Sequence, residues 1–369
     1  MGMLLRAKLI MQTAADAAAI AGAAELNYKG TLDQWGGSVS AAAKAAATQN
    51  GVTDGVKGAT VTVNNPPAGG SHTGSGYVEV IASQSQPTIF MQLFQSGKPT
   101  VAARAVAGLP SSHACLYTLK ASGTGILANG SLTISLPGCA IYDNSADSTQ
   151  AMLLNGSGSL TAKSIGVVGH VLKNGGFATT PTPVTGIAPV TDPLSYLSPP
   201  NSGTCSANPN INGSGTYNLN AGCYNGLTIN GSATVNLNAG TYYINGALTF
   251  NGSGTISGTG VMFYTTGASV FNGSQTLNLA APTSGTYNGI LFFQSRSVGT
   301  SVIFNGSNSS SLKGILYYPA AQLTMNGSSS TNLYTSIVAS SCLFNGSLSL
   351  KDYALVNANS PLSMAALME

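Results

Sequence analysis

The chain has 369 residues, of which 43% are hydrophobic and only 6% are charged, and its formal net charge is +3. An ordinary soluble domain has roughly a quarter of its residues charged, so Asn, Ser, Thr and backbone amides must keep this chain in solution. The thirteen Lys and Arg residues form no run of adjacent basic side chains, which argues against a nucleic-acid partner, and the apolar residues recur with a period, which argues against disorder.

Residues 1–110 predict a small α+β module with a long N-terminal helix. The Ala-rich stretch from Leu4 to Asn27 favours this helix, and residues 39–48 favour a second one that ends at Asn50 and Gly51. The remaining predicted elements are strands at 59–63, 77–81 and 100–106 and a short helix, with Pro at its start, at 87–94. No stretch of about 20 uncharged apolar residues is present, so we expect no segment of the chain to span a bilayer.

Beyond Pro110 a repeat begins. The triplet Asn-Gly-Ser occurs nine times, and five of the eight steps between its copies span 18 to 21 residues. The longest gap holds Asn174-Gly175-Gly176 and a Pro-rich segment at 181–209, which we interpret as an inserted loop. The triplets begin at Asn129, Asn155, Asn212, Asn230, Asn251, Asn272, Asn305, Asn326 and Asn345.

Apolar residues alternate on both sides of each triplet, as on a strand with one buried face. A unit of about 20 residues holds two or three short strands, too few to close a core, whereas stacked units cover one another. We therefore predict a right-handed parallel β-helix over residues 111–369. The inward positions are one and three residues before the Asn (Ile229, Phe250, Phe271, Phe304, Met325, Phe344; Leu227, Leu248, Ser269, Val302, Leu323, Cys342) and five and seven after it (Ile134, Leu136, Tyr217, Leu219, Val235, Leu237, Leu277, Leu279).

The Asn-Gly pair suits a corner of such a coil. Asn tolerates left-handed backbone angles and Gly adopts them freely, so both residues are candidates for the turn. Asn side chains stacked about 4.8 Å apart can also hydrogen-bond along the solenoid axis. N-glycosylation is the competing interpretation of the triplet, but regular placement at a corner favours turn chemistry.

Five Cys residues include two couples at short separation, Cys115 with Cys139 and Cys205 with Cys223. Neither couple has the spacing of a zinc site. We interpret both as structural disulfides and Cys342 as a buried thiol, which predicts an extracytoplasmic location, at the cell surface or secreted. Five reduced cysteines in the core are the alternative.

The chain has few residues that could take part in catalysis. Glycoside hydrolysis needs two carboxylates and calcium-dependent lyases need several acids, yet residues 193–351 contain no Asp or Glu. Asp143 and Asp147 lie close together in one predicted loop, where we expect solvated turn residues. We expect His170 to be a packing residue, and His72 and His113 have no partner at ligand spacing. The sequence thus predicts no catalytic residue, metal or cofactor.

The segment LIMQTAADAAAIAGA (Leu9–Ala23) and the later pattern YVEV, PTIFMQLF and TVAARAVAG resemble the N-terminal region of tight-adherence (Tad) pilus-assembly proteins of the TadG type. The remaining chain is similar to the β-helical extension of some of these proteins, in CLYTL, LPGCAIY, LNAGTYYI, APTSGTYNGILFFQ and KGILYYP. The resemblance implies a longer precursor anchored in the inner membrane by a helix upstream of this chain. Many relatives carry a von Willebrand A-type metal site, whose Asp-x-Ser-x-Ser motif is absent here.

These observations predict a non-enzymatic structural protein of a Tad-type pilus or cell-surface assembly, whose solenoid is a rigid rod for display or self-assembly. Expected partners are other pilus or envelope proteins or copies of the chain. One alternative is an adhesin whose polar ladders bind a glycan surface or another extended ligand such as ice, and a second is a polysaccharide-active enzyme. The polar ladder that would bind such a ligand has outward hydroxyls at Thr228, Thr249 and Thr324, but apolar residues interrupt it at Val270, Ile303 and Leu343.

Overall fold

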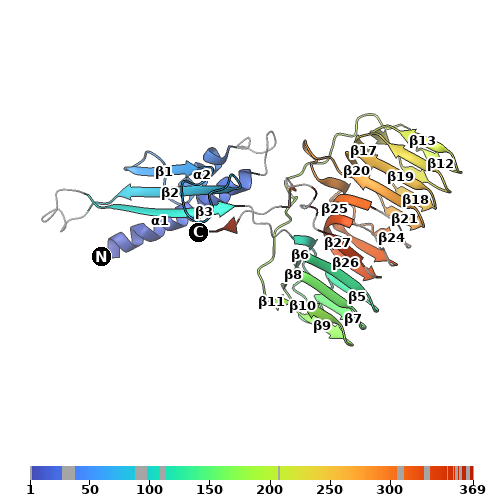
Figure 1. Ribbon diagram of the computed structural model, residues 1–369, viewed down its shortest axis with the longest axis horizontal. Coiled ribbons are helices and arrows are strands. Elements are labelled where there is room, and N and C mark those ends of the chain that lie inside the picture. Colours follow the sequence, from blue (N-terminus) through green and yellow to red (C-terminus); the bar gives the residue numbers. More distant parts are fainter. Residues whose placement is uncertain are drawn as a thin grey trace. The chain divides into compact units, whose positions relative to one another are not determined.

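The structure is a computed structural model that forms two compact units, Met1–Ser111 with Ser363–Glu369 and Ser112–Leu362 (Figure 1). We call them unit 1 and unit 2 and describe each by itself. The predicted fold class, a mainly β chain with a parallel β-helix after a small α+β module, is confirmed. The described residues are 2–26, 38–87, 98–108, 114–206, 208–305, 311–327, 333–346, 348–351, 353, 356, 360–362 and 366–368.

Unit 1 packs two helices with a four-stranded antiparallel sheet of order β1-β2-β3-β28. The two long predicted helices and the three predicted strands are confirmed, whereas the helix predicted at 87–94 lies almost entirely outside the described residues. The short strand β28 was not predicted. The elements are α1 (Gly2–Glu25), α2 (Val39–Gln49), β1 (Ala59–Asn64), β2 (Tyr77–Ser85), β3 (Thr100–Gly108) and β28 (Ala366–Leu367).

The buried side of α1 consists mainly of alanines, which lets the helix approach its neighbours closely. Ala14, Ala15, Ala18 and Ala19 are all fully buried in one cluster with strand residues of the sheet. At Gly22 a Cβ atom would lie only 3.1 Å from Cγ1 of Val78. The small residues of this helix therefore favour helix formation and also allow its close packing.

Unit 2 is a parallel β-solenoid, and β4 to β27 form one continuous 24-stranded sheet. The strands are β4 (Ala114–Thr118), β5 (Ile126–Asn129), β6 (Thr133–Asp143), β7 (Met152–Asn155), β8 (Ser159–Val167), β9 (Val171–Asn174), β10 (Ala178–Thr180), β11 (Val184–Thr185), β12 (Asn210–Ile211), β13 (Thr216–Leu219), β14 (Gly222–Tyr224), β15 (Leu227–Ile229), β16 (Thr234–Leu237), β17 (Gly240–Ile244), β18 (Leu248–Gly252), β19 (Thr255–Thr259), β20 (Val261–Thr265), β21 (Ser269–Gly273), β22 (Thr276–Ala280), β23 (Ile290–Gln294), β24 (Val302–Phe304), β25 (Ser311–Asn326), β26 (Leu333–Asn345) and β27 (Leu348–Lys351).

Each coil has three faces. Face 1 is the column of strands that reaches the Asn corner, such as β15, β18 and β21; face 2 follows the corner, as in β16, β19 and β22; and face 3 completes the coil, as in β17, β20 and β23. The long strands β6, β8, β25 and β26 pass through more than one face. The inward residues of all three faces form one continuous core, as the alternation predicts. Tyr217 is the exception: it was expected in the core but is 37% exposed, because it lies on the end coil of the stack and no further described coil covers it.

The coils are stacked in an order that differs from their order in the chain. Strands β26 and β27, near the end of the chain, pair in parallel with β4, β5 and β6, near the start of unit 2. Ile337 lies beside Leu116, and Cys342 lies beside Ile126. Figure 1 shows the orange and red strands β25 to β27 next to β5, β6 and β8. The chain therefore enters and leaves the solenoid in the middle of the stack, at what we call the closing interface.

Residues 186–209 connect the two ends of the stack. The chain leaves β11 at one end and begins again with β12 at the other. Leu194 and Leu197 of this crossover are buried against an apolar cluster on the outer side of face 3. The Pro-rich segment predicted as an inserted loop is therefore largely this crossover.

Candidate functional surfaces

The Asn corners form a ladder of side-chain amides along the solenoid. In eight steps of the ladder, Nδ2 of one Asn donates a hydrogen bond of 2.6–2.9 Å to Oδ1 of the next. The bond from Asn129 to Asn345 carries the ladder across the closing interface. In stacking order its members are Asn212, Asn230, Asn251, Asn272, Asn305, Asn326, Asn345, Asn129, Asn155 and Asn174.

The left-handed backbone at these corners belongs to the Gly and not to the Asn. Gly231 has φ 76° and Gly252 has φ 141°, while Lys57 is the non-Gly residue with positive φ among the residues described. A Cβ atom on Gly252 would lie 1.9 Å from the carbonyl oxygen of Gly231 in the next coil. The expectation that Asn shares the left-handed turn is wrong, and Asn serves the axial hydrogen bond instead.

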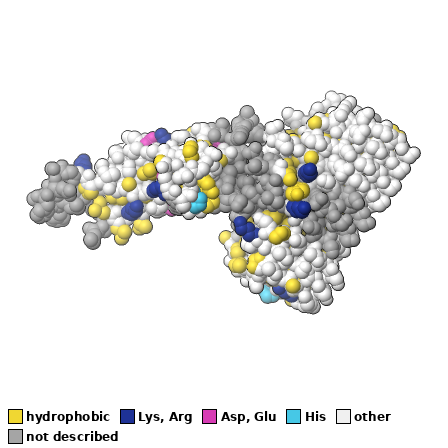
Figure 2. Space-filling view, in the orientation of Figure 1, with side chains coloured by type: hydrophobic (Ala, Val, Ile, Leu, Met, Phe, Trp, Pro, Cys, Tyr) yellow, Lys and Arg dark blue, Asp and Glu magenta, His cyan; other side chains and the backbone are white. Residues whose placement is uncertain are grey.

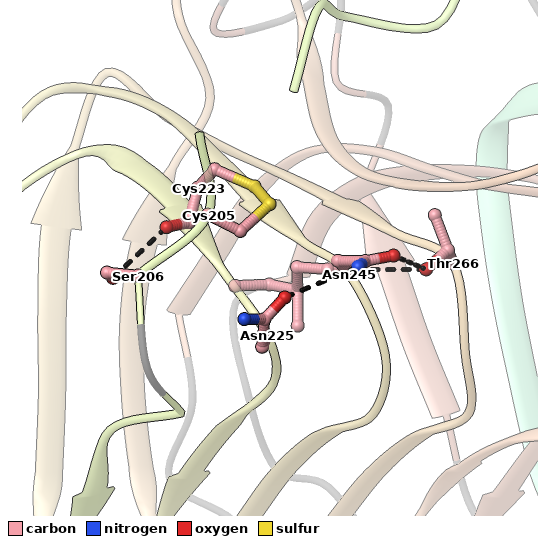
Figure 3. Close-up of a disulfide and its surroundings, with 7 residues drawn as sticks. Cys205, Ser206, Cys223, Asn225, Asn245 and Thr266 are labelled. Carbon is pink, nitrogen blue, oxygen red and sulfur yellow. Dashed lines mark hydrogen bonds between the residues drawn. A yellow bond between two sulfur atoms is a disulfide. The ribbon is translucent and has the colours of Figure 1, made fainter. Parts of the chain in front are cut away.

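The two predicted disulfides are present, and Cys342 is a buried free thiol. Figure 3 shows that Cys205–Cys223 joins the end of the crossover to the first coil after it, where Ser206 Oγ donates to the Cys223 carbonyl (3.2 Å). Nearby, Asn245 donates to Asn225, and Thr266 donates to Asn245. Disulfides of this kind are typical of an oxidising, extracytoplasmic environment.

Face 2 presents two rows of small polar side chains to solvent. One row has Thr at four consecutive coils, Thr216, Thr234, Thr255 and Thr276, and continues on other coils with Thr133 and Ser159. The second row holds Asn218, Asn236, Ser257, Asn278, Ser311, Ser135, Thr161 and Thr180. Figure 2 shows that the described surface of the solenoid in that view is largely neither charged nor hydrophobic.

Face 1 has one outward row, and its polar character is interrupted as expected. The register joins Thr228, Thr249, Val270, Ile303, Thr324 and Leu343 on consecutive coils. The row continues across the closing interface with Leu127 and Leu153, so it is more apolar than polar there. Sequence reasoning examined the Thr residues of face 1 and missed the more regular rows of face 2.

Face 3 is covered on its outer side by the crossover. Tyr243, Tyr264, Phe293 and Tyr317 form a ladder of outward aromatic rings with centroids 4.9–5.0 Å apart. Arg296 donates hydrogen bonds to Tyr317 OH and to the carbonyls of Leu197 and Leu194, at 2.7–3.0 Å. Face 3 is thus a second packed layer, and faces 1 and 2 remain as the open surfaces of the coils.

Asp143 is not the solvated turn residue that the sequence predicts. It ends β6 at an inward position and is fully buried, and its Oδ1 accepts hydrogen bonds from Thr118 Oγ1 (2.8 Å) and the Ser145 amide (3.1 Å). Burial raises the pKa of its carboxyl to about 6, against the effect of these bonds. Gly125 makes room for the carboxyl, since a Cβ there would lie 2.0 Å from Oδ1.

The other candidate titratable groups lie apart. Asp147 is a turn residue, and hydrogen bonds from Thr149 and Gln150 lower the pKa of its carboxyl to about 2. His170 is exposed, so its predicted packing role is wrong. The His72 ring lies beside the Tyr77 ring in a tilted arrangement, with ring centroids 4.9 Å apart. His113 lies outside the described residues.

Burial also makes the remaining thiol unreactive. It raises the pKa of the Cys342 thiol, and the nearby Asp143 charge adds to this effect. Within the described ranges, no group of three or more His, Cys, Asp and Glu side chains could hold a metal ion. Among the helices that the structure describes, none combines the length and the hydropathy of a membrane-spanning segment.

In the described part of unit 1, the buried Glu79 carboxylate pairs with the partly exposed Arg104. Burial alone would raise the pKa of the Glu79 carboxyl, but hydrogen bonds from Asn64, Arg104 and the Ala68 amide hold it below its ordinary value. The Arg104 Nε to Glu79 Oε1 distance is 2.6 Å. Since every contact of this carboxylate lies within the sheet and its adjoining loop, we assign it to the stability of unit 1.

Comparison of the chain with known protein families, with curated proteins and with solved structures found no match.

Proposed function

We propose that the chain is a non-enzymatic structural protein of a bacterial Tad-type pilus or cell-surface assembly, in which the solenoid acts as a rigid rod. The observation that carries the proposal is the amide ladder, which links coil to coil and crosses the closing interface from Asn345 to Asn129. Stacked parallel strands with such a ladder resist bending in the way that other stacked β structures do. The resemblance of residues 1–110 to TadG-type proteins supports the pilus context, and the disulfides support export.

Deletion of the gene in a piliated host tests this proposal. We expect fewer pili by electron microscopy, recovery when the full chain is restored, and labelling of the protein on the cell surface by immunogold. Normal pili in the deletion strain, together with protein found only inside the cell, would contradict the proposal. Depolymerisation of a polysaccharide by the purified chain would instead favour the enzyme alternative.

A second candidate function, binding of an extended neutral ligand, is favoured by the two polar rows of face 2. Strand residues on one side of a strand are about 6.8 Å apart and coils about 4.8 Å apart, so the rows form a regular grid of hydroxyls and amides. Such a grid suits a ligand with its own repeat, namely a neutral polysaccharide or an ice surface. The rows contain no charged side chain, which argues against an ionic ligand.

Glycan arrays and ice-recrystallisation assays with the full chain test this second candidate. Thr234→Tyr places a large ring on face 2, and Thr249→Tyr is the matched control on face 1. We expect binding to be lost with Thr234→Tyr and kept with Thr249→Tyr. Equal effects of the two substitutions, or no binding by the parent chain, would contradict a role for face 2.

A further inference from the structure

Polar side chains line one interior corner of the solenoid, where face 3 meets face 1. The last inward position of face 3 holds Thr265, Gln294, Tyr318, Ala339, Thr118 and Asp143 on six consecutive coils. All six side chains are at most 2% exposed. They continue the inward alternation of Phe263, Phe292 and Leu316, which belong to the apolar core. We call this line of residues, with Ser269 at the adjoining start of face 1, the polar column.

Five atoms of the polar column have no hydrogen-bond partner among the described residues. They are Thr265 Oγ1, Ser269 Oγ, Gln294 Oε1, Tyr318 OH and Asp143 Oδ2. A buried polar atom left unpaired costs about 1–3 kcal/mol. Most buried polar atoms in folded proteins are bonded either to protein or to ordered water. Four of the five, those of Thr265, Ser269, Gln294 and Tyr318, lie on three consecutive coils and therefore indicate a shared partner that is not protein. Asp143 Oδ2 lies three coils beyond Tyr318.

The column is bounded by apolar residues, and some of its positions hold smaller side chains than those residues. Ile244 and Leu248 occupy the same two positions one coil before Thr265 and Ser269, and Val167 follows Asp143 at the other end. Thr, Ser and Ala thus take positions that large aliphatic residues fill elsewhere. Since neighbouring coils are about 4.8 Å apart, one water molecule can reach polar atoms on two of them.

We propose that the polar column binds a short file of ordered water molecules inside the solenoid, which bridges polar atoms on the three neighbouring coils of Thr265, Gln294 and Tyr318. Four of the five unpartnered atoms are neutral hydroxyl or amide oxygens, which water satisfies as donor or acceptor. Water is favoured over a cation because Asp143 is the only acidic residue in the column. The file would satisfy the buried polar atoms without opening the core to solvent.

Thermal unfolding of full-length Tyr318→Phe tests the proposal, with Tyr242→Phe as the matched control. The Tyr242 hydroxyl lies 2.8 Å from the carbonyl oxygens of Leu219 and Asn238 and donates its one hydrogen to them, so its removal should lower Tm. If water binds the Tyr318 hydroxyl, Tyr318→Phe should lower Tm by a comparable amount. If the column is dry, removal of an unpartnered hydroxyl should leave Tm unchanged or raise it, and the proposal is overturned.

A crystal structure of the full chain provides the second measurement. We expect ordered water density within hydrogen-bond distance of Tyr318 OH and Gln294 Oε1. Thr265→Val keeps the side-chain shape but removes the hydroxyl, and it should displace the water nearest to that position while Thr265→Ser retains it. A corner without density in the parent chain would overturn the proposal even if the Tyr318 variant were destabilised.

Discussion

Phe271 lies at the centre of a group of stacked rings inside the solenoid. Its ring centroid is 4.2 Å from that of Phe304, and it meets Phe250 and Phe292 edge-on at 5.3 Å. Consecutive coils thus place aromatic rings in direct contact along the axis. At the scale of a residue, the core depends on such ladders because each coil alone has too few apolar side chains to bury one another.

Replacing Phe271 by Ala should lower the free energy of unfolding by roughly 3–5 kcal/mol, because a cavity opens between three neighbouring rings. Urea unfolding of the purified chain measures this change. Val270→Ala, on the outward side of the same strand, is the control and should cost much less. A loss below about 1 kcal/mol for Phe271→Ala would show that the ring is not in a packed core.

Asp143 should make the stability of unit 2 depend on pH. Its folded-state pKa, about 6, lies above the ordinary 3.8, so the folded chain holds this proton more tightly. The stabilisation is fully present below about pH 4 and is lost as the pH rises through 6, by roughly 3 kcal/mol in all. Asp143→Asn should remove this dependence, and the difference between the urea midpoints of the two chains across pH 4–8 measures it.

The burial of single residues could be predicted from the sequence where the repeat sets it, but not where the neighbouring residues suggest a different local structure. The inward residues near the Asn corners follow from alternation on short strands. The sequence predicts a solvated loop at Asp143, because Asp147 and other polar residues follow it closely. In the structure, β6 extends into face 3 and ends at Asp143. The polar column was also missed, because its members become neighbours only when the coils are stacked.

At the scale of elements, Arg296 is one of the side chains that hold the crossover on the solenoid, and Asn144 and Tyr287 also form hydrogen bonds with it. Arg296 binds the carbonyls of Leu194 and Leu197, and its guanidinium lies 5.2 Å from the centroid of the Tyr317 ring. Tyr317 OH in turn donates to Asp192 Oδ2 at 2.6 Å. A segment with few hydrogen bonds of its own is thus fixed along the solenoid by side chains of face 3.

Arg296→Gln should loosen the crossover, since hydrogen bonds to a charged group contribute about 1.5–3 kcal/mol. We expect chymotrypsin to cut the variant near Tyr196 several-fold faster than the parent chain while the solenoid core stays folded. Lys313→Gln, which changes an exposed cation on β25, is the matched control and should leave the cleavage rate unchanged. Equal cleavage rates for parent and Arg296→Gln would show that this side chain does not hold the crossover.

At the scale of the whole unit, the sequence does not reveal the order in which the coils are stacked. Every coil offers the same kind of parallel edge, the same apolar pair and the same Asn corner, so any coil could stack on any other. The repeat therefore predicts a solenoid and its corner residues but not that β26 pairs with β4 and β5. The crossover decides the order, and its sequence shows only that it is rich in Pro.

The stacking order predicts that a permuted chain will fold. Lys351 lies beside Tyr334, and Leu116 lies beside Ile337, so the end of β27 at Lys351 and the start of β4 at Ala114 follow each other on the same coil. A chain that starts at residue 205, joins Lys351 to Ala114 and ends at residue 186 should form the same stack with sequential coils. Circular dichroism and a crystal structure measure the outcome, and a permutant that forms no β structure would contradict the closing interface.

The entry and exit points in mid-stack also determine where tension acts on the chain. Strand β3 leads toward the solenoid, and β28 returns from it and pairs antiparallel with β3 through Gly108 and Ala366. Pulling the two chain ends apart would therefore unzip this short pair one hydrogen bond at a time. The pulling force would then reach the coils at the closing interface first, so it would not stretch most of the solenoid along its axis.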